Sequence, residues 1–431
     1  MNSSNPQRII DNIAAQFGSD ELILLESQLK SHPSSQRSFL AVRAKNWIRA
    51  EHDRVSWRVN GKSKSTDMNP WEAIKLFRKK TGGWLFGYLG YDLKNFTENL
   101  SSANRALIAA PDLYFMEPEI LLIEEKGQWR EVSGSIPNDL SPGIAAKSLF
   151  KQMSANIEPA ITKKEYLENV NSIRQMIAEG NFYELNYTYP MFGDCSADGF
   201  ELYRQMRRIN PVPFGGYLRL ENLEICCASP ERFLKKNGLK VRSEPIKGTT
   251  ARSKKKWIDE NRKNELLNEK NRAENLMIVD LVRHDLSRIA KTGSVKVSSL
   301  YDVQTFETLH QLISVVEAEA RPDADPVVVI KNCFPMGSMT GAPKIEVMKT
   351  IERMENYKRG IYSGAIGYIT PDGDFDFNVV IRTAILQNGH LMYPVGGAIT
   401  SDSDPEKEWE ETKVKARGLV KVFSEDHFSP K

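Results

Sequence analysis

The sequence predicts an α+β fold in which antiparallel strands are mixed with long helices. Strand-like alternation of apolar and polar residues marks 182–192 and 214–247, and it returns at 364–369, 375–386 and 391–395. Helical spacing of apolar residues marks 163–180, 260–289 and 405–423. Because these elements do not alternate as regular strand–helix–strand units, antiparallel sheets are favoured over a doubly wound parallel sheet. No Walker-type or dinucleotide glycine motif follows a strand, so no nucleotide site is predicted.

The amino-terminal part contains short β-rich runs at 22–25, 84–88 and 120–123. A stretch rich in Ser, Gly, Pro and Asn follows at 134–142, and segment 143–160 has mixed helical character up to Pro159. We therefore expect a boundary near residue 160. It divides the chain into an amino-terminal region, 1–160, and a larger region, 161–431.

The larger region opens with a helix in which Tyr166, Val170, Ile173 and Ile177 recur at helical spacing, and Gly180 is expected to end it. Residues 260–289 are expected to form one long helix. Pro405 suits the first turn of the last helix, 405–423.

Composition excludes several classes of function. The 431 residues are 40% hydrophobic and carry a net charge of +3, so neither nucleic acid nor an anionic membrane is an expected partner. The basic run 252–256 contains no aromatic residue that could stack on a base. No apolar run approaches the roughly 20 residues of a membrane span, and the amino terminus does not read as a secretory signal. Four cysteines in no disulfide or zinc spacing indicate a reducing, cytoplasmic location.

Acidic side chains provide the first candidate site. Glu408, Glu411 and Lys415 fall on one face of the last helix, since residues three and four apart are neighbours. Glu274 lies in the apolar-faced segment 272–285. Such a set could hold Mg²⁺, which prefers few carboxylates and several other oxygens. On the residues alone, a charged face exposed to solvent is the favoured alternative.

Three motifs together resemble those of chorismate-utilising enzymes. They are Arg-Ala-Glu-Asn-Leu-Met-Ile-Val-Asp-Leu at 272–281, Gly-Ser-Met-Thr-Gly-Ala-Pro-Lys at 337–344, and Glu-x-x-Glu-x-x-x-Lys at 408–415. The resemblance runs from about 24 to 417 and implies large antiparallel sheets packed as a sandwich with helices outside. It also implies that Glu274 and Glu411, with Glu408 through water, hold Mg²⁺ against the ring carboxylate of chorismate.

The same resemblance assigns the contacts to chorismate. A planar guanidinium such as that of Arg382 suits a carboxylate because it donates two parallel hydrogen bonds. The implied substrate-binding residues are Gly248, Thr249, Thr340, Tyr362, Arg382, Gly396, Gly397, Ala398 and Lys415. Ala398 replaces the usual Gly and would be strained if its φ were positive. His310 matches the active-site His of the family, and a hydrogen-bonded structural His is its alternative.

Lys247 distinguishes this chain within the family. Most members carry Ala at this position in segment 244–252, and those with Lys look like component I of aminodeoxychorismate synthase. The resemblance implies that Glu231, as a buried general acid, protonates the C4 hydroxyl. It also implies that Lys247 attacks C2 as a neutral amine, its pKa lowered by burial and magnesium, and that ammonia then displaces it.

Glu184 departs from the family, in which amine-adding members usually carry Gln and water-adding members Lys. Water addition is therefore not expected, and the acid either holds ammonium or tunes the lysine. Segments 24–27 and 210–214 resemble the family's tryptophan pocket, and whether tryptophan binds here is left open.

No cysteine lies in the glycine-rich setting of a glutaminase nucleophile, so a separate glutamine amidotransferase subunit is expected to supply ammonia. Two alternatives stay open. One is component I of anthranilate synthase, which shares every site except the lysine. The other is a non-catalytic homologue that only docks and activates a glutaminase.

Overall fold

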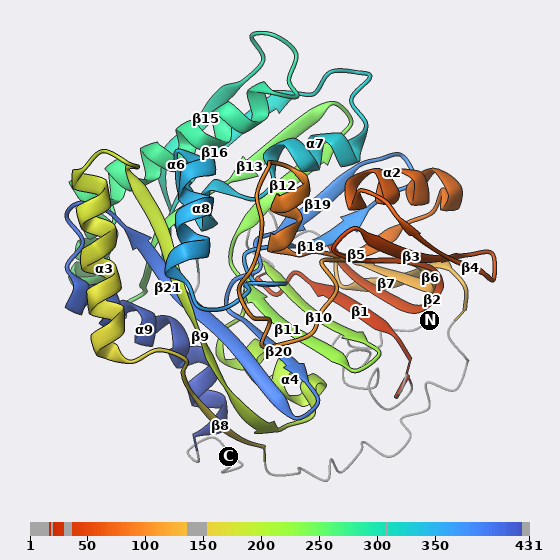
Figure 1. Cartoon of the computed structure of the whole chain (residues 1–431), viewed down its shortest axis with the longest axis horizontal. Helices are drawn as coiled ribbons and strands as arrows, with labels where there is room; N and C mark the ends of the chain where they lie inside the picture. Colours follow the sequence, from red (N-terminus) through yellow and green to blue (C-terminus); the bar gives the residue numbers. More distant parts are fainter. Residues whose placement is uncertain (1–16, 19, 30–36, 136–152, 307–308, 425–431) are drawn as a thin grey trace.

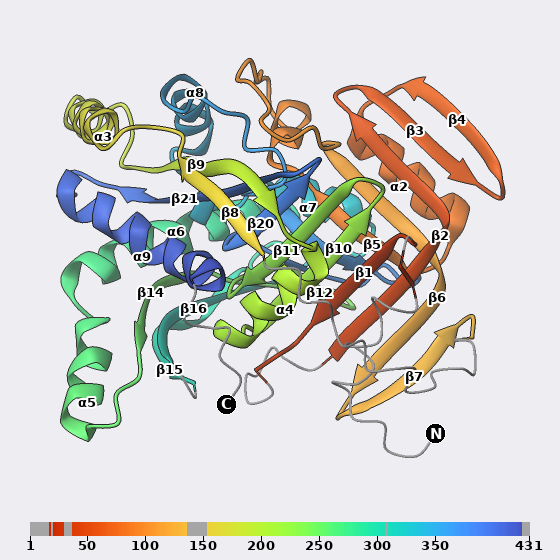
Figure 2. The same ribbon diagram turned by 90° about the horizontal axis from the view of Figure 1, so that it is seen from below.

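The computed structural model describes residues 17–18, 20–29, 37–135, 153–306 and 309–424. Within these ranges, 21 strands belong to one connected hydrogen-bonded network, in which neighbouring strands pair antiparallel. The helices lie mainly around the outside of the strands (Figures 1 and 2). The predicted α+β class with large antiparallel sheets is confirmed.

Strands predominate between residues 22 and 159; those labelled β1 to β7 gather on the right of Figure 1, whereas β8 lies at the lower left. Helix α2 begins where the side chain of Asn69 accepts a hydrogen bond from the backbone of Trp71, and it ends at Gly82 in a left-handed conformation (φ 69°). The predicted strands at 22–25, 84–88 and 120–123 correspond to β1, β5 and β6. In order, the elements are β1 (Leu22–Glu26), β2 (Arg37–Glu51), β3 (Arg54–Val59), β4 (Lys62–Asp67), α2 (Pro70–Thr81), β5 (Leu85–Leu89), η1 (Tyr91–Phe96), β6 (Leu113–Glu125), β7 (Gln128–Ser133) and β8 (Ser154–Pro159).

The second half combines longer helices with strands that complete the sheet. The predicted helices at 163–180 and 405–423 are confirmed as α3 and α9, and α9 begins with Pro405 as expected. In order, the elements are α3 (Lys163–Ala178), β9 (Glu184–Ser196), α4 (Gly199–Ile209), β10 (Phe214–Leu220), β11 (Leu223–Ser229), β12 (Arg232–Asn237), β13 (Lys240–Glu244), β14 (Ile246–Ala251), α5 (Lys256–Glu265), α6 (Glu269–Ser287), β15 (Lys296–Thr305), β16 (Leu309–Glu319), α7 (Pro326–Cys333), η2 (Gly337–Met339), β17 (Gly341–Ala342), α8 (Lys344–Met354), β18 (Ala365–Ile369), β19 (Phe375–Asn378), β20 (Thr383–Gln387), β21 (His390–Ile399) and α9 (Pro405–Phe423).

Three boundaries differ from the prediction. The expected helix 260–289 is two helices, because Asn268 begins α6 by capping the backbone N–H of Asn271. The expected strand 375–386 is interrupted before β20, where Arg382 adopts φ 53°. Residues 154–159 form a strand and not a helical segment, because they pair with β9. Of the stretches 134–142 and 143–160, residues 136–152 lie outside the described residues.

The two predicted regions share sheet and core. Strand β1 pairs with β2 on one side and with β10 on the other, and β5 pairs with both β6 and β18. One apolar cluster contains Leu24 together with Tyr217, and another contains Phe77 together with Phe233. The division at residue 160 remains a prediction. Side chains from both sides of it are buried in the same apolar clusters.

The β9–β21 ladder positions the site described below. The two strands run side by side through the left half of Figure 1, with Gly396 opposite Thr188 and Ala398 opposite Asn186. Helix α9 packs on β21, and α6 packs on β16. No helix in the described ranges is long and apolar enough to cross a membrane.

Candidate active site

A cavity of about 480 Å³ lies among β14, α6, β21 and α9. Most of the site residues predicted from the sequence line it, although they come from distant parts of the chain. Those that line it are Glu231, Lys247, Gly248, Thr249, Glu274, Tyr362, Arg382, Gly396, Gly397, Ala398, Glu408, Glu411 and Lys415. The cavity therefore brings an amine, several carboxylates and a guanidinium to one place.

Lys247 lies among acidic side chains. Its side chain is 11% exposed, and Nζ lies 2.7 Å from Oε1 of Glu184 and 3.8 Å from Oε2 of Glu274. Burial by itself would lower the pKa of Lys247, but the charges of Glu184 and Glu274 outweigh it, so the pKa lies above its usual value. Without the cation both carboxylates stabilise the charged amine, and the lowering expected from burial together with magnesium stays a prediction.

Glu231 has the environment expected of a general acid. It follows β11 and is 6% exposed. Burial raises the pKa of Glu231 to about 7, and the charge of Lys247 offsets part of the effect. A carboxyl with this pKa is partly protonated near neutral pH and can donate a proton to a leaving oxygen.

Glu408 and Glu411 approach the cavity from α9. A methyl group added at Gly397 would lie 3.5 Å from Oε2 of Glu408 and 4.0 Å from Oε1 of Glu411, so both carboxylates lie against the backbone of β21. Lys415 bonds Oε1 of Glu411 at 2.7 Å and the carbonyl of Gly396 at 2.7 Å. The charge of Lys415 lowers the pKa of Glu411 and holds it as a carboxylate.

Lys270 connects the two acidic helices. Its Nζ lies 3.3 Å from Oε1 of Glu408 and 3.8 Å from Oε1 of Glu274. Sequence reasoning did not single out Lys270, although its position four residues before Glu274 on one helix was a usable signal. The position of this amine shows that the space between the carboxylates of Glu274 and Glu408 attracts cations.

The acidic residues suit a magnesium ion only with further ligands. Within the described ranges, no three His, Cys, Asp or Glu side chains are grouped closely enough to hold a metal alone. Mg²⁺ is commonly held by one or two carboxylates plus waters and ligand oxygens. Glu274, Glu408 and Glu411 supply oxygens of the right chemistry on one wall of the cavity. The residues therefore fit a metal whose coordination a bound anion and water complete.

Arg382 and Tyr362, which the resemblance assigns to a substrate carboxylate, line the same cavity. Arg382 adopts the left-handed region at φ 53°, which is strained for a side chain with a Cβ and is frequent at functional sites. No carboxylate of the described residues forms an ion pair with it, so its guanidinium is free to bind one. Tyr362 is buried, and burial raises the pKa of its phenol, which keeps the hydroxyl a donor.

Gly396, Gly397 and Ala398 are consecutive residues of β21. A Cβ at Gly396 would lie 2.2 Å from the carbonyl oxygen of Tyr187, so only glycine fits there. Ala398 is not among the residues with positive φ, and it pairs with Asn186 as extended strand. The strain anticipated for alanine at this position is absent.

Thr340 and His310 do not line the cavity. Thr340 is fully buried, donates its hydroxyl to the carbonyl of Met336 at 3.1 Å, and accepts the backbone N–H of Asn186 at 2.8 Å. His310 is also buried, with Nε2 3.1 Å from Oδ1 of Asp259 and Nδ1 2.9 Å from the hydroxyl of Thr305. Both ring nitrogens are therefore occupied, as in a structural histidine, and its catalytic role stays a prediction.

Arg359 was missed by sequence reasoning, yet it bonds two residues that line the cavity, Met339 and Asn186. This buried guanidinium donates to the carbonyls of Met339 at 2.7 Å and Asn186 at 2.8 Å, and to the hydroxyl of Ser363 at 3.2 Å. It also pairs with Glu355 at 2.6 Å. Its position three residues before Tyr362 was the only sequence signal.

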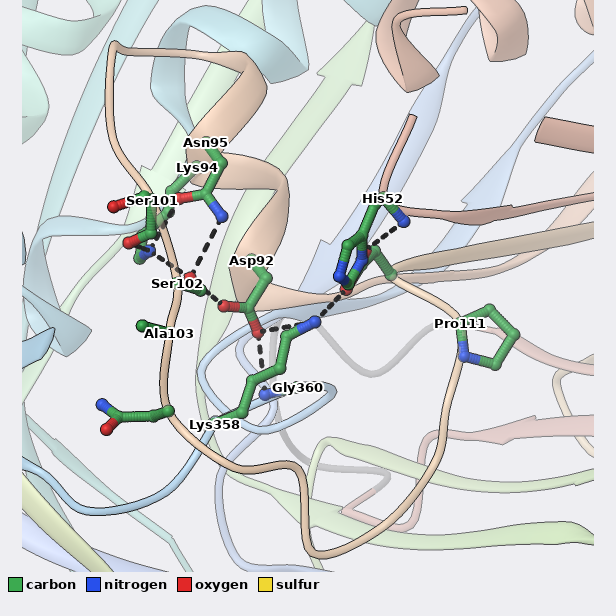
Figure 3. Close-up of polar contacts among 12 residues, drawn as sticks. His52, Asp92, Lys94, Asn95, Ser101, Ser102, Ala103, Pro111, Lys358 and Gly360 are labelled. Carbon is green, nitrogen blue, oxygen red and sulfur yellow. Dashed lines mark hydrogen bonds and ion pairs between the residues drawn. The ribbon is translucent and has the colours of Figure 1, made fainter. Parts of the chain in front are cut away.

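A polar network supports the turn that precedes Tyr362. Figure 3 shows the side chain of Lys358 beside that of Asp92, and its Nζ lies 4.0 Å from Oδ2 of Asp92 and 2.9 Å from Oδ1 of Asp112. Asp92 also accepts the backbone N–H of Gly360 at 3.2 Å and the hydroxyl of Ser102 at 2.6 Å. The network thus fastens the 91–112 segment to the turn at 358–360.

A second cavity, of about 390 Å³, lies where the tryptophan pocket was expected. Leu25, Glu26 and Ser27 line one side, and Pro213 and Phe214 line another. The two segments that the sequence singled out are therefore adjacent. Binding of tryptophan there stays a prediction.

Comparison of the sequence with known proteins identifies the same family as the motifs do. A family model described as chorismate binding enzyme matches residues 21–421. An aminodeoxychorismate synthase of Streptomyces griseus is 45% identical over 60% of this chain, although the chain spans only 36% of that protein. Aminodeoxychorismate synthase component 1 of Bacillus subtilis is 32% identical over 79% of this chain and 77% of its own length.

A solved structure shows the same fold. Anthranilate synthase component I from Streptococcus pneumoniae superimposes with a TM-score of 0.78 and 27% identity, over 91% of this chain and 93% of the other. Because the family model covers nearly the whole chain, this protein belongs to the chorismate binding enzymes.

Proposed function

We propose that this chain is component I of an aminodeoxychorismate synthase, which converts chorismate and ammonia into 4-amino-4-deoxychorismate. The observation that carries the proposal is Lys247, whose amine enters a cavity that also holds Glu231 and Arg382. Relatives named aminodeoxychorismate synthase support the same branch of the family.

The residues suit a two-step amination. Arg382 and Tyr362 bind and orient a carboxylate of the substrate by donated hydrogen bonds. Glu231 gives its proton to the C4 hydroxyl, which leaves as water. Lys247 gives a proton to Glu184, its partner at 2.7 Å, and then forms a bond from Nζ to C2, which gives a covalent adduct. Ammonia then bonds to C4, and the bond between C2 and Nζ breaks.

The proposed cofactor is magnesium, held by Glu274 and Glu411 directly and by Glu408 through water. When bound, it would supply positive charge that binds the ring carboxylate of the substrate. Lys270 and Lys415 supply that charge in part, since each lies beside one of these carboxylates.

The ammonia donor in this proposal is a separate glutamine amidotransferase subunit, and the product leads to p-aminobenzoate and folate. Cys195, Cys226, Cys227 and Cys333 are all buried and unpaired. Such thiols are not placed to act as a glutaminase nucleophile, and they fit a reducing compartment such as the cytoplasm.

Product analysis tests this function. The isolated chain with chorismate, magnesium chloride and ammonium chloride should consume chorismate and form aminodeoxychorismate, identified by mass spectrometry. Fluorescent anthranilate as the product would favour the second candidate, anthranilate synthase component I, which the solved structure of that name supports. No magnesium-dependent consumption of chorismate would favour a non-catalytic homologue.

A further inference from the structure

The turn that carries Tyr362 lies between two cavities. Tyr362 lines the active-site cavity, whereas Lys358, Gly360 and Ile361 line a smaller cavity of about 240 Å³. A Cβ at Gly360, whose φ is 57°, would meet no described atom within 4 Å. Side chains therefore do not fill the space behind Gly360, and the position of the turn depends on hydrogen bonds and ion pairs.

The start of η1 bonds both backbone polar groups of Gly360. Oδ2 of Asp92 accepts the N–H of Gly360 at 3.2 Å, as the dashed line in Figure 3 shows. The N–H of Tyr91, the first residue of η1, donates to the carbonyl of Gly360 at 2.7 Å. Two residues further on, the N–H of Tyr362 donates to the carbonyl of Arg359 at 3.1 Å and closes the turn. The position of Tyr362 thus depends on contacts made at Gly360.

The carboxylate of Asp92 is itself held in place. Asp92 is 3% exposed, and its Oδ1 accepts the hydroxyl of Ser102 at 2.6 Å. Nζ of Lys358 lies 4.0 Å from Oδ2. Burial raises the pKa of Asp92, and the charge of Lys358 offsets part of the effect. With Oδ1 bonded to Ser102, the other oxygen is directed at Gly360 (Figure 3).

Asp92 and Ser102 do not line the active-site cavity. We propose that Asp92 is a positioning residue for the substrate: through Gly360, it sets where the hydroxyl of Tyr362 lies in that cavity. This rests on the proposed function, in which Tyr362 binds a carboxylate of chorismate. Residues 91–102, from the amino-terminal part of the chain, thereby contribute to substrate binding without contact with the substrate.

The smaller cavity explains why the contact matters. Without Asp92 the N–H of Gly360 loses its acceptor, and the turn has room behind it to move. A misplacement on the order of 1 Å, caused far from the chemistry, is enough to weaken a productive contact strongly. The loss should therefore appear in the affinity for chorismate, and only while the hydroxyl of Tyr362 is present.

A double-mutant cycle separates positioning of Tyr362 from a general loss of stability. All chains carry Lys247→Ala, which cannot form the adduct, so calorimetric titration with chorismate and magnesium chloride reports binding alone. Asp92→Ala should weaken binding about 10-fold, and Tyr362→Phe should weaken it by a similar factor. In the Tyr362→Phe background, Asp92→Ala should weaken binding by less than about 2-fold, because the hydroxyl that it positions is already absent.

The cycle can also overturn the proposal. If the two losses are independent and multiply to about 100-fold, Asp92 acts on something other than Tyr362. Unchanged binding in either single variant would refute the role as well. Should Asp92→Ala fail to fold, Ser102→Ala tests the same contact, because it removes only the hydroxyl that donates to Asp92. It should weaken binding about 3-fold, and by no more than the error of the titration once Tyr362→Phe is present.

Two further variants complete the experiment. Asp92→Asn keeps an oxygen for the N–H of Gly360 and should bind chorismate within about 3-fold of the parent chain. A loss as large as that of Asp92→Ala would contradict the proposal, since the acceptor would then not be what matters. The control is Asp194→Asn, whose carboxylate is 83% exposed and pairs with His390, and which should behave as the parent.

Product analysis with the wild-type chain tests the proposed function separately. A chain that binds chorismate and shows the non-additive cycle, but forms no aminodeoxychorismate, would refute that function and leave the role of Asp92 standing. Formation of aminodeoxychorismate with fully independent losses would refute the role of Asp92 alone. No binding of chorismate at all would refute both.

Discussion

Lys247 and Glu184 form a buried ion pair, with 2.7 Å between Nζ and Oε1. The amine is therefore charged in the absence of substrate and cannot act as a nucleophile until it loses a proton. The negative charge of Glu184, and of Glu274 at 3.8 Å, favours this resting state. In the proposed reaction the amine must therefore lose a proton before it bonds to C2.

Replacing Lys247 tests the covalent route. Lys247→Ala should abolish any chorismate adduct in the intact mass and lower the rate of amination by about 100-fold or more. Lys349→Ala, on the exposed side of α8, is the control and should leave both measurements unchanged. An unchanged rate in the Lys247 variant would show that the lysine is a bystander.

The pH dependence should report Glu231. A general acid acts in its protonated form, so kcat/KM should fall as the pH rises through about 7, the pKa that burial gives this carboxyl. Above that pH the fall should be about tenfold per pH unit. Glu231→Gln should lower kcat/KM by about 100-fold or more and remove this limb of the profile. A limb that persists in the variant would assign it to another group.

The magnesium requirement should depend on Glu411. Glu411→Gln should raise the magnesium concentration for half-maximal activity by about 10-fold, because the ion loses a charged oxygen. Chelation with EDTA should abolish activity in the wild type. Glu410→Gln changes the neighbouring residue, whose carboxylate is 60% exposed and pairs with Lys413, and should have no effect. Equal effects of the two substitutions would argue against a metal at Glu411.

Arg359 should be essential for stability. Arg359→Ala would leave the Glu355 carboxylate buried without its partner and should lower the free energy of unfolding by about 3–5 kcal/mol. Arg353→Ala, at an exposed position of α8, should change it by less than about 0.5 kcal/mol. Urea denaturation followed by circular dichroism measures both. A small change in the Arg359 variant would mean that the pair contributes little to the fold.

The two glycines of β21 should respond differently to alanine. Gly396→Ala would place a methyl group 2.2 Å from the backbone oxygen of Tyr187, which cannot move cheaply, and should destabilise the protein. Gly397→Ala would meet the flexible end of Lys415 at 3.3 Å, so the chain should fold but bind chorismate about 10-fold more weakly. Thermal melting and the KM for chorismate distinguish the two outcomes. Equal melting temperatures would contradict the geometry at Gly396.

Local sequence patterns predicted the elements with the strongest signals. Helix 405–423 was predicted to the residue, because Pro405 marks its start and its apolar spacing is regular. The single helix expected at 260–289 is two helices, because the cap formed by Asn268 gives no distinct signal within a long periodic segment. The strand at 375–386 was continued through Arg382, whose left-handed backbone depends on its surroundings and not on its own preference.

The residues of the candidate site also fall into those that local sequence predicted and those that it did not. The motifs around Glu274, Lys247 and Glu411 identified the carboxylates and the amine, since each motif is contiguous in sequence. The role of Arg359 was not predicted, because part of it depends on the folded chain: its guanidinium donates to the carbonyl of Asn186, 173 positions away.

The sequence by itself therefore determined the fold class, the family and the kinds of group in the cavity. Only the tertiary structure decided their charge states and partners. Burial and neighbouring charge set whether Lys247 is an ammonium and whether Glu231 keeps its proton, and both depend on how distant strands and helices pack. The sequence gives the functional group of each side chain, whereas the folded site determines its pKa and its hydrogen-bond partners.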